Sequence, residues 1–200
     1  MKFNEYRQKY NNLTFKEKKR IHEGWEKVYP QTFFPSKSAF CKICINMILE
    51  EVVKEKLKIL EVGTYDGKMA LHILTVFPTF IWIGYDILNR PIESALVKYD
   101  FKRIILDKEI YETNLDKDYD IFYSGDTLEH FSSSEIIKII DKTSFIPYQI
   151  HVVDFGRSGS DAHVMMFNPL TLDSVFLKYY DIILKAKDGA RKFYFFKRNS

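Results

Sequence analysis

The sequence KILEVGTYDG, residues 58–67, joins a short apolar strand to a turn that contains two glycines. The apolar residues of the strand suit a buried parallel sheet. The glycines allow the backbone to turn sharply and to approach a ligand closely. A helix is expected directly after the turn, over residues 68–77, and its first backbone N–H groups are free to bind a ligand. A strand, turn and helix in this order hold nucleotide-like ligands.

The spacing of the glycines narrows the choice of ligand. A dinucleotide-binding fingerprint requires G-x-G-x-x-G, but Tyr65 occupies the place of the second glycine. Gly63 and Gly67 instead form G-x-x-x-G, and Glu61 lies two residues before Gly63. This arrangement resembles the first motif of class I S-adenosylmethionine-dependent methyltransferases. The resemblance implies S-adenosylmethionine as the cofactor, with Glu61, Gly63, Thr64, Tyr65 and Gly67 among its binding residues.

Two further strands follow at the distances that this resemblance requires. Residues 79–86 indicate a second buried strand that ends in Asp86, whose carboxylate can accept hydrogen bonds from two ribose hydroxyls. The resemblance also places Ile87 at the cofactor. A third strand over residues 101–106 is followed by Asp107, which in such enzymes lies near the adenine.

A polar loop follows the fourth predicted strand, because residues 119–131 read YDIFYSGDTLEHF. Ligands of doubly wound sheets bind at the carboxyl ends of the strands, where this loop lies. A sulfonium methyl group is already a strong electrophile, so the enzyme must position a nucleophile and remove the proton of a hydroxyl. Candidates for this chemistry are His130 and His163, together with Asp126 and Glu129. Asp126 is also expected to contact the cofactor.

The same residues also permit a metal site. Asp126, Glu129, His130 and the later His163 resemble the Glu-x-x-Glu-His plus distant His of small-RNA 2'-O-methyltransferases, with aspartate in the first place. The Leu-Glu-His segment also resembles that of ubiquinone-pathway O-methyltransferases. These side chains could hold Mg²⁺ or Mn²⁺, which would lower the pKa of a bound hydroxyl. Aspartate shortens one ligand arm, so an acid-base role without metal is favoured. In a third interpretation, Glu129 and His130 only brace the following helix.

The C-terminal third completes the resemblance. Residues 163–172 read HVMMFNPLTL, which is similar to the segment that enters the last helix of many small-molecule methyltransferases. A fifth strand is predicted over 148–155, and a hairpin over 181–185 and 192–196 around an Asp-Gly turn. The predicted fold is therefore α/β, with a Rossmann-like, doubly wound sheet of seven strands. The sheet is expected to be mostly parallel, with one antiparallel strand near the C-terminus.

An N-terminal helical extension, residues 1–55, precedes the predicted methyltransferase domain, residues 56–200. Thr14 and Glu17 form a capping box that opens a helix to about residue 28. In methyltransferases of this kind such an extension commonly forms a lid over the substrate. A structural brace is the alternative.

The remaining histidines and the cysteines are expected to be structural. Cys41 and Cys44 form a C-x-x-C on one face of a helix predicted over residues 38–54, and a metal site would need two more ligands. They are interpreted as reduced core residues. His22 and His72 lie on predicted helices outside the polar loop, and His151 falls within the fifth strand.

Composition limits the class of partner. The net charge of +3 is too small to imply a polyanion, and 46% hydrophobic residues suit a soluble domain. The N-terminus is charged and no apolar run could span a bilayer, so a cytoplasmic protein without a membrane partner is predicted. The function predicted is methyl transfer to a hydroxyl or amine of a small molecule, with sugars and sugar phosphates as candidates. Alternatives are an RNA 2'-O-methyltransferase with a divalent metal, and an inactive cofactor-binding subunit.

Overall fold

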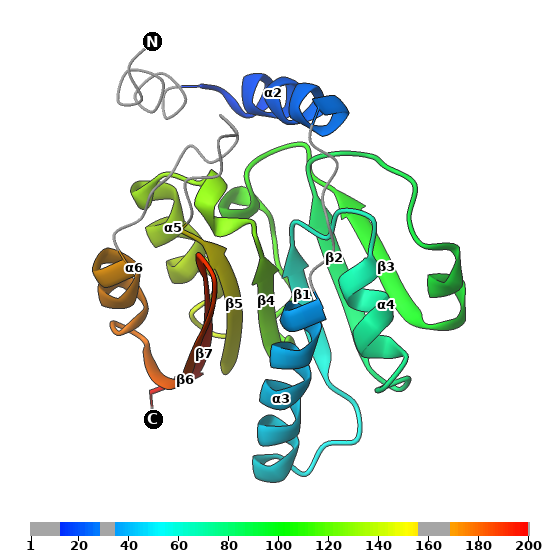
Figure 1. The fold of residues 1–200 in the computed structure, drawn as a ribbon, viewed down its shortest axis with the longest axis vertical. Coiled ribbons are helices and arrows are strands. Elements are labelled where there is room, and N and C mark those ends of the chain that lie inside the picture. The colour runs from blue at the N-terminus through cyan, green and yellow to red at the C-terminus, as the bar shows by residue number, and fades with distance from the viewer. Residues whose placement is uncertain (1–12, 29–34, 156–168, 200) are drawn as a thin grey trace.

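The computed structural model describes residues 13–28, 35–155 and 169–199 (Figure 1). Its centre is a seven-stranded sheet in the order β3-β2-β1-β4-β5-β7-β6. The strands are β1 (Lys58–Val62), β2 (Ile81–Asp86), β3 (Asp100–Ile105), β4 (Ile121–Gly125), β5 (Tyr148–Asp154), β6 (Tyr180–Asp188) and β7 (Arg191–Arg198). Strands β1 to β5 pair in parallel, whereas β7 is antiparallel to both β5 and β6. The predicted Rossmann-like sheet with one inserted antiparallel strand is confirmed.

Helices connect and cover these strands. The α-helices are α2 (Phe15–Val28), α3 (Pro35–Glu51), α4 (Lys68–Leu74), α5 (Ser133–Thr143) and α6 (Pro169–Phe176). Short 3-10 helices are η1 (Ser94–Lys98), η2 (Ile110–Glu112) and η3 (Leu128–His130). In Figure 1, α3 and α4 lie in front of the sheet. Among the described residues, no helix combines the length and apolar character needed to cross a membrane.

Two apolar cores lie on opposite faces of the sheet. Because successive strand residues point to opposite faces, Ile59 packs in the core under α3 and α4, while Leu60 packs in the core under α5 and α6. All residues of β4 before Gly125 are buried, as expected for a strand covered on both faces. The carboxyl ends of β1, β2 and β4 therefore lie next to one another at one end of a rigid sheet.

Helix α2 lies across one end of the sheet in Figure 1. Its predicted capping box is confirmed: Thr14 N donates to Glu17 Oε2 at 2.8 Å, and Glu17 N donates to Thr14 Oγ1 at 3.4 Å. Lys18 forms ion pairs with Glu109, which follows β3, and with Glu135 of α5, which follows β4. These contacts place α2 at the carboxyl ends of the parallel strands, above the glycine turn.

Several element boundaries differ from those predicted. Helix α3 begins at Pro35 rather than at residue 38, because proline suits the first position of a helix, and it ends at Glu51 rather than at residue 54. The last helix is predicted from its Asn-Pro start to reach about residue 180, but α6 ends at Phe176 and β6 begins at Tyr180. The hairpin strands are longer than predicted, and their turn contains Gly189 at φ 59°.

The predictions for buried cysteines and for His151 are confirmed. Cys41 and Cys44 are free thiols in the core, and burial raises the pKa of Cys44 to about 12. His151 is fully buried, with Nδ1 2.8 Å from Ser124 Oγ and Nε2 3.0 Å from Gln149 Oε1. Burial lowers the pKa of His151 to about 3, so this histidine is a neutral structural residue.

Candidate functional site

The turn after β1 has a backbone that favours glycine. Gly63 and Gly67 both have φ 80°, in the left-handed region that side chains disfavour. A Cβ atom on Gly63 would lie 2.2 Å from Thr127 Oγ1, so the loop after β4 rests directly on this glycine. Tyr65 adopts φ 51° without being a glycine, which marks a strained position of the kind found at binding sites.

Asp86 ends β2 beside this turn. Its Oδ2 accepts a hydrogen bond from Tyr65 N at 2.7 Å, and its Oδ1 accepts one from Leu88 N at 2.8 Å. Burial raises the pKa of Asp86, although these bonds and two nearby arginines oppose the shift. Each carboxylate oxygen can accept a further hydrogen bond. The arrangement suits a ligand with two neighbouring hydroxyl groups.

Glu61 supports the turn from within β1. Its Oε2 accepts hydrogen bonds from Thr64 Oγ1 at 2.5 Å and from Trp82 Nε1 at 2.8 Å. Burial raises the pKa of Glu61 to about 7, against the lowering effect of these two bonds. Thr64 fits because Gly84 on the neighbouring strand has no side chain: a Cβ there would lie 2.4 Å from Thr64 Oγ1.

Two cavities meet at the glycine turn, and both are lined by Gly63 and Tyr65. The α3 cavity lies toward α3 and α4, and its lining includes Lys37, Glu61, Thr64, Met69, Tyr123 and Gly125. The α2 cavity lies under α2, and its lining includes His22, Asp86, Ile87, Leu106, Asp126 and His130. Most predicted cofactor residues therefore line one cavity or the other. Gly67 and Asp107 line neither, and Asp107 is exposed beside Leu106.

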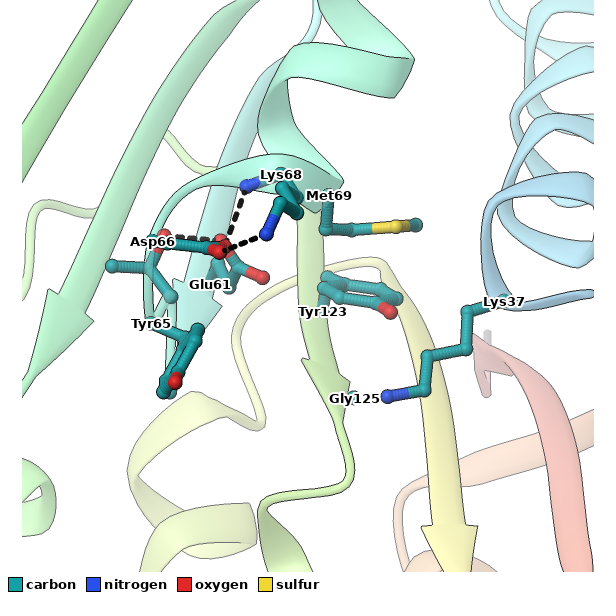
Figure 2. Close-up of a pocket in the computed structure, with 10 residues that line it drawn as sticks. Lys37, Glu61, Tyr65, Asp66, Lys68, Met69, Tyr123 and Gly125 are labelled. Carbon is teal, nitrogen blue, oxygen red and sulfur yellow. Dashed lines mark hydrogen bonds and ion pairs between the residues drawn. The ribbon is translucent and has the colours of Figure 1, made fainter. Parts of the chain in front are cut away.

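Tyr123 points into the α3 cavity (Figure 2). Its hydroxyl is buried and has no hydrogen-bond partner among the described residues. Burial raises the pKa of Tyr123 well above its usual value, so the group is a protonated donor. A Cβ on Gly125 would lie 2.4 Å from this hydroxyl, so the glycine makes room for it. An orphaned buried donor in a cavity suits a polar ligand group.

Charged side chains from both cavities form a cluster: Lys37 lines the α3 cavity and Asp126 lines the α2 cavity. The Asp126 carboxylate lies 2.5 Å from Lys37 Nζ and accepts hydrogen bonds at 3.2 Å from Arg191 Nε to both of its oxygens. Arg191 also pairs with Asp154 at 3.4 Å. Figure 2 shows Lys37 reaching from α3 toward Gly125. Asp126, at φ 51°, is thus neutralised by two cations from different elements.

Glu129 is placed differently from the other candidates. Its side chain is fully buried, it lines neither cavity, and neither carboxyl oxygen has a hydrogen-bond partner within the described ranges. Burial and the nearby Asp126 charge raise the pKa of Glu129 well above its usual value, so it is a neutral acid. Across residues 13–28, 35–155 and 169–199, no three His, Cys, Asp or Glu side chains gather as metal ligands. His163 lies outside the described residues.

The structure corrects the assignment of His22. His22 is on α2, and its ring lies 5.1 Å from that of His130, at an interplanar angle of 81°. Both rings line the α2 cavity together with Asp86. The prediction that His22 lies apart from the polar loop was therefore wrong, because α2 folds back over the sheet. His72, by contrast, is exposed on α4.

Comparisons with known proteins identify the fold. No protein-family model and no curated protein matches the sequence. Magnesium protoporphyrin IX methyltransferase from Synechocystis, solved with bound S-adenosylhomocysteine, matches with a TM-score of 0.65 and 11% identity over 96% of this chain and 98% of that one. The chain has the fold of S-adenosylmethionine-dependent methyltransferases.

Two other structures show the same likeness. The PH0226 protein from Pyrococcus horikoshii has a TM-score of 0.63 and 14% identity over 88% of this chain and 99% of that one. Human N-acetylserotonin methyltransferase, solved with S-adenosylmethionine, has a TM-score of 0.59 and 10% identity over 94% of this chain and 57% of that one. At such identities the likeness concerns the fold alone.

Proposed function

We propose that this protein is an S-adenosylmethionine-dependent methyltransferase that acts on a hydroxyl or amine of a small molecule. The observation that carries the proposal is the pair of cavities that meet at Gly63, with the Asp86 carboxylate in one and the orphaned Tyr123 hydroxyl in the other. Neighbours of the same fold were solved with S-adenosylmethionine or its demethylated product. Sugars and sugar phosphates are the acceptors to test first.

The α2 cavity suits the adenosine part of this cofactor. Asp86 would accept hydrogen bonds from the ribose hydroxyls, and Ile87 and Leu106 offer apolar surface to the base. Asp107 remains a predicted contact near the adenine. The α3 cavity suits the amino-acid end, because the Tyr123 hydroxyl offers a hydrogen-bond donor without a partner among the described residues, and Lys37, which is paired with Asp126, lies in the same lining. The two ends would be held on opposite sides of Gly63, where a side chain would block the passage.

When bound, S-adenosylmethionine supplies a methyl group on a positively charged sulfur. The chain's own part is then to hold the acceptor and, for a hydroxyl, to take up its proton. His130 lines the α2 cavity beside Gly63 and is the proposed proton acceptor. His163 is the second candidate.

Asp126 and Glu129 are proposed in supporting roles. Asp126 is held between Lys37 and Arg191 and can fix the loop that carries His130. Glu129 is buried in the same loop as a neutral acid. A carboxyl group that is already protonated cannot accept a further proton, so Glu129 cannot act as the base. These placements favour chemistry by His130 over chemistry by either carboxyl.

Calorimetric titration with S-adenosylmethionine and S-adenosylhomocysteine, with and without Mg²⁺, tests the cofactor. Micromolar binding of both would support the proposal and justify screening sugars, phenols and RNA for methyl acceptance. If neither ligand binds, the cofactor assignment fails. If both bind but no acceptor in any class is methylated, an inactive partner subunit becomes the better interpretation. A requirement for Mg²⁺ in turnover would instead favour the metal site.

A further inference from the structure

The N-terminal helix brings a second imidazole to the candidate acceptor site. His22 of α2 and His130 of η3 come from segments more than a hundred residues apart, yet their rings are in contact and line one cavity with Gly63 and Asp86. We infer that His22 is a positioning residue that holds the His130 ring toward the acceptor site. This role rests on the proposed function, in which His130 accepts a proton.

Ion pairs of Lys18, one helical turn before His22, hold α2 on the domain. We call Lys18, Glu109 and Glu135 the anchor. Residues four apart on a helix lie on the same face, so Lys18 and His22 both point toward the domain. Lys18 Nζ lies 3.1 Å from Glu109 Oε1 and also pairs with Glu135, and all three side chains are nearly buried. Glu135 in turn accepts a hydrogen bond from Ser132 N at 2.8 Å. The anchor ties α2 to the segments that follow β3 and β4.

His130 ends a short element at the rim of the α2 cavity. The 3-10 helix η3 has three residues, and its last member, His130, is only partly buried. The edge-to-face contact with His22, at 81° between the ring planes, is a favourable aromatic geometry. In this arrangement the His130 ring lines the α2 cavity with the His22 ring beside it.

Burial and neighbouring charges keep the His22 ring neutral. Burial, the charge of His130, and the nearby Arg90 and Lys18 lower the pKa of His22 to about 3. Glu109, Asp86 and Asp126 are the acidic groups around the same cavity. His22 therefore stays neutral at physiological pH and does not compete with His130 for the proton of the acceptor.

The proposed step balances as follows for a hydroxyl acceptor. The O–H proton moves to an imidazole nitrogen of His130, and an oxygen lone pair forms the bond to the methyl carbon. A bound S-adenosylmethionine would supply that methyl group, and the electron pair of its carbon–sulfur bond would remain with the departing neutral thioether. His22 neither gains nor loses a proton, and its part is to keep the His130 ring oriented.

Histidine NMR tests the inference without an acceptor substrate. The protein is labelled at histidine 13Cε1, and the signals are assigned by their loss in single variants and followed from pH 8 to pH 5. The His22 signal should not titrate in this range. In His22→Ala, the His130 signal should move and broaden at pH 8, because the ring loses the edge-to-face contact with His22. In His22→Phe, which keeps a ring edge at this place, the wild-type position and width of the His130 signal should be largely restored.

Controls separate the possible failures. His72→Ala, on the exposed face of α4, should leave the His130 signal unchanged, and thermal unfolding should show that each variant is folded. An unchanged His130 signal in His22→Ala, or equal changes in the Ala and Phe variants, would overturn the positioning role. Binding of S-adenosylhomocysteine by the wild type is measured in parallel. Its absence would refute the proposed function but not the contact between the two rings.

Discussion

Replacing Tyr123 with phenylalanine is expected to move stability and ligand affinity in opposite directions. The Tyr123 hydroxyl is buried, at 1% exposure of the residue, and has no hydrogen-bond partner in the described part of the chain. An unsatisfied buried polar group costs about 1–3 kcal/mol of stability. Removing the oxygen leaves a small void, so the expected net gain is about 1 kcal/mol, equivalent to a rise of about 2–4 °C in Tm for a chain of this size.

The same substitution should weaken ligands that reach the α3 cavity. A hydrogen bond to a charged group contributes about 1.5–3 kcal/mol, so Tyr123→Phe should lower the affinity for S-adenosylhomocysteine at least about tenfold. The nucleoside 5'-methylthioadenosine lacks the amino-acid end and would not reach Tyr123. Its affinity should therefore be unchanged. Calorimetry with both ligands and thermal unfolding without ligand measure the two effects.

A matched control is Tyr99→Phe, because the Tyr99 hydroxyl is exposed and contacts Thr75 Oγ1 at 3.5 Å, outside both cavities. It should alter neither affinity. A lower Tm for Tyr123→Phe would contradict the assignment of an orphaned hydroxyl. Equal S-adenosylhomocysteine affinity in variant and wild type would show that the amino-acid end binds elsewhere, and equal weakening of both ligands would show that Tyr123 acts through the fold.

Three further predictions concern the turn and the core. Asp86→Ala should weaken S-adenosylhomocysteine and 5'-methylthioadenosine alike, by about 2 kcal/mol or more, because both ligands carry the ribose; Asp118→Ala, on an exposed side chain, is the calorimetric control. Gly63→Val should abolish binding of both and lower the denaturant midpoint, because its side chain would meet Thr127 at a backbone φ of 80°. For His151, the folded pKa of about 3 lies below the ordinary 6.5, so stability should be lost as pH falls below 6.5 toward 3. The loss that comes from His151 should approach about 1.4 kcal/mol per pH unit in urea unfolding, and His22, whose pKa is also lowered to about 3, should add a similar loss. His151→Gln should therefore reduce the slope by about 1.4 kcal/mol per pH unit without abolishing it; an unchanged slope would contradict a neutral buried imidazole.

The sheet could be predicted because its signals are local. The apolar strand before Gly63 and the carboxylate that ends β2 both lie within single short segments, and their order along the chain fixes the topology of a doubly wound sheet. The capping box at Thr14 is also local, since it joins residues three apart. Element ends were less accurate, because they depend on where the next element packs.

The site residues that were not predicted lie on elements that reach the site through long-range packing, which a short segment of sequence does not reveal. Lys37 lies at the start of α3 and His22 in the middle of α2, and both meet the loop after β4 only in the folded chain. Tyr123 looked like any apolar strand residue, and its free hydroxyl follows from what surrounds it. Only a search for polar residues on the buried face of an otherwise apolar strand could have singled out Tyr123 in advance.

The distribution of charge over the two cavities is consistent with a site that binds a cation and releases a neutral product. Two carboxyl groups near Gly63, those of Asp86 and Glu61, can carry a negative charge. The negative charge of Asp126 is already balanced by the positive charges of Lys37 and Arg191. Burial raises the pKa of Glu61 to about 7, so this side chain can ionise when a positive ligand arrives and return to its acid form when it leaves. Binding of S-adenosylmethionine should then release a proton near pH 7 to a greater extent than binding of S-adenosylhomocysteine does. Calorimetric enthalpies measured in buffers of different ionisation enthalpy would detect this difference, and Glu61→Gln should remove it.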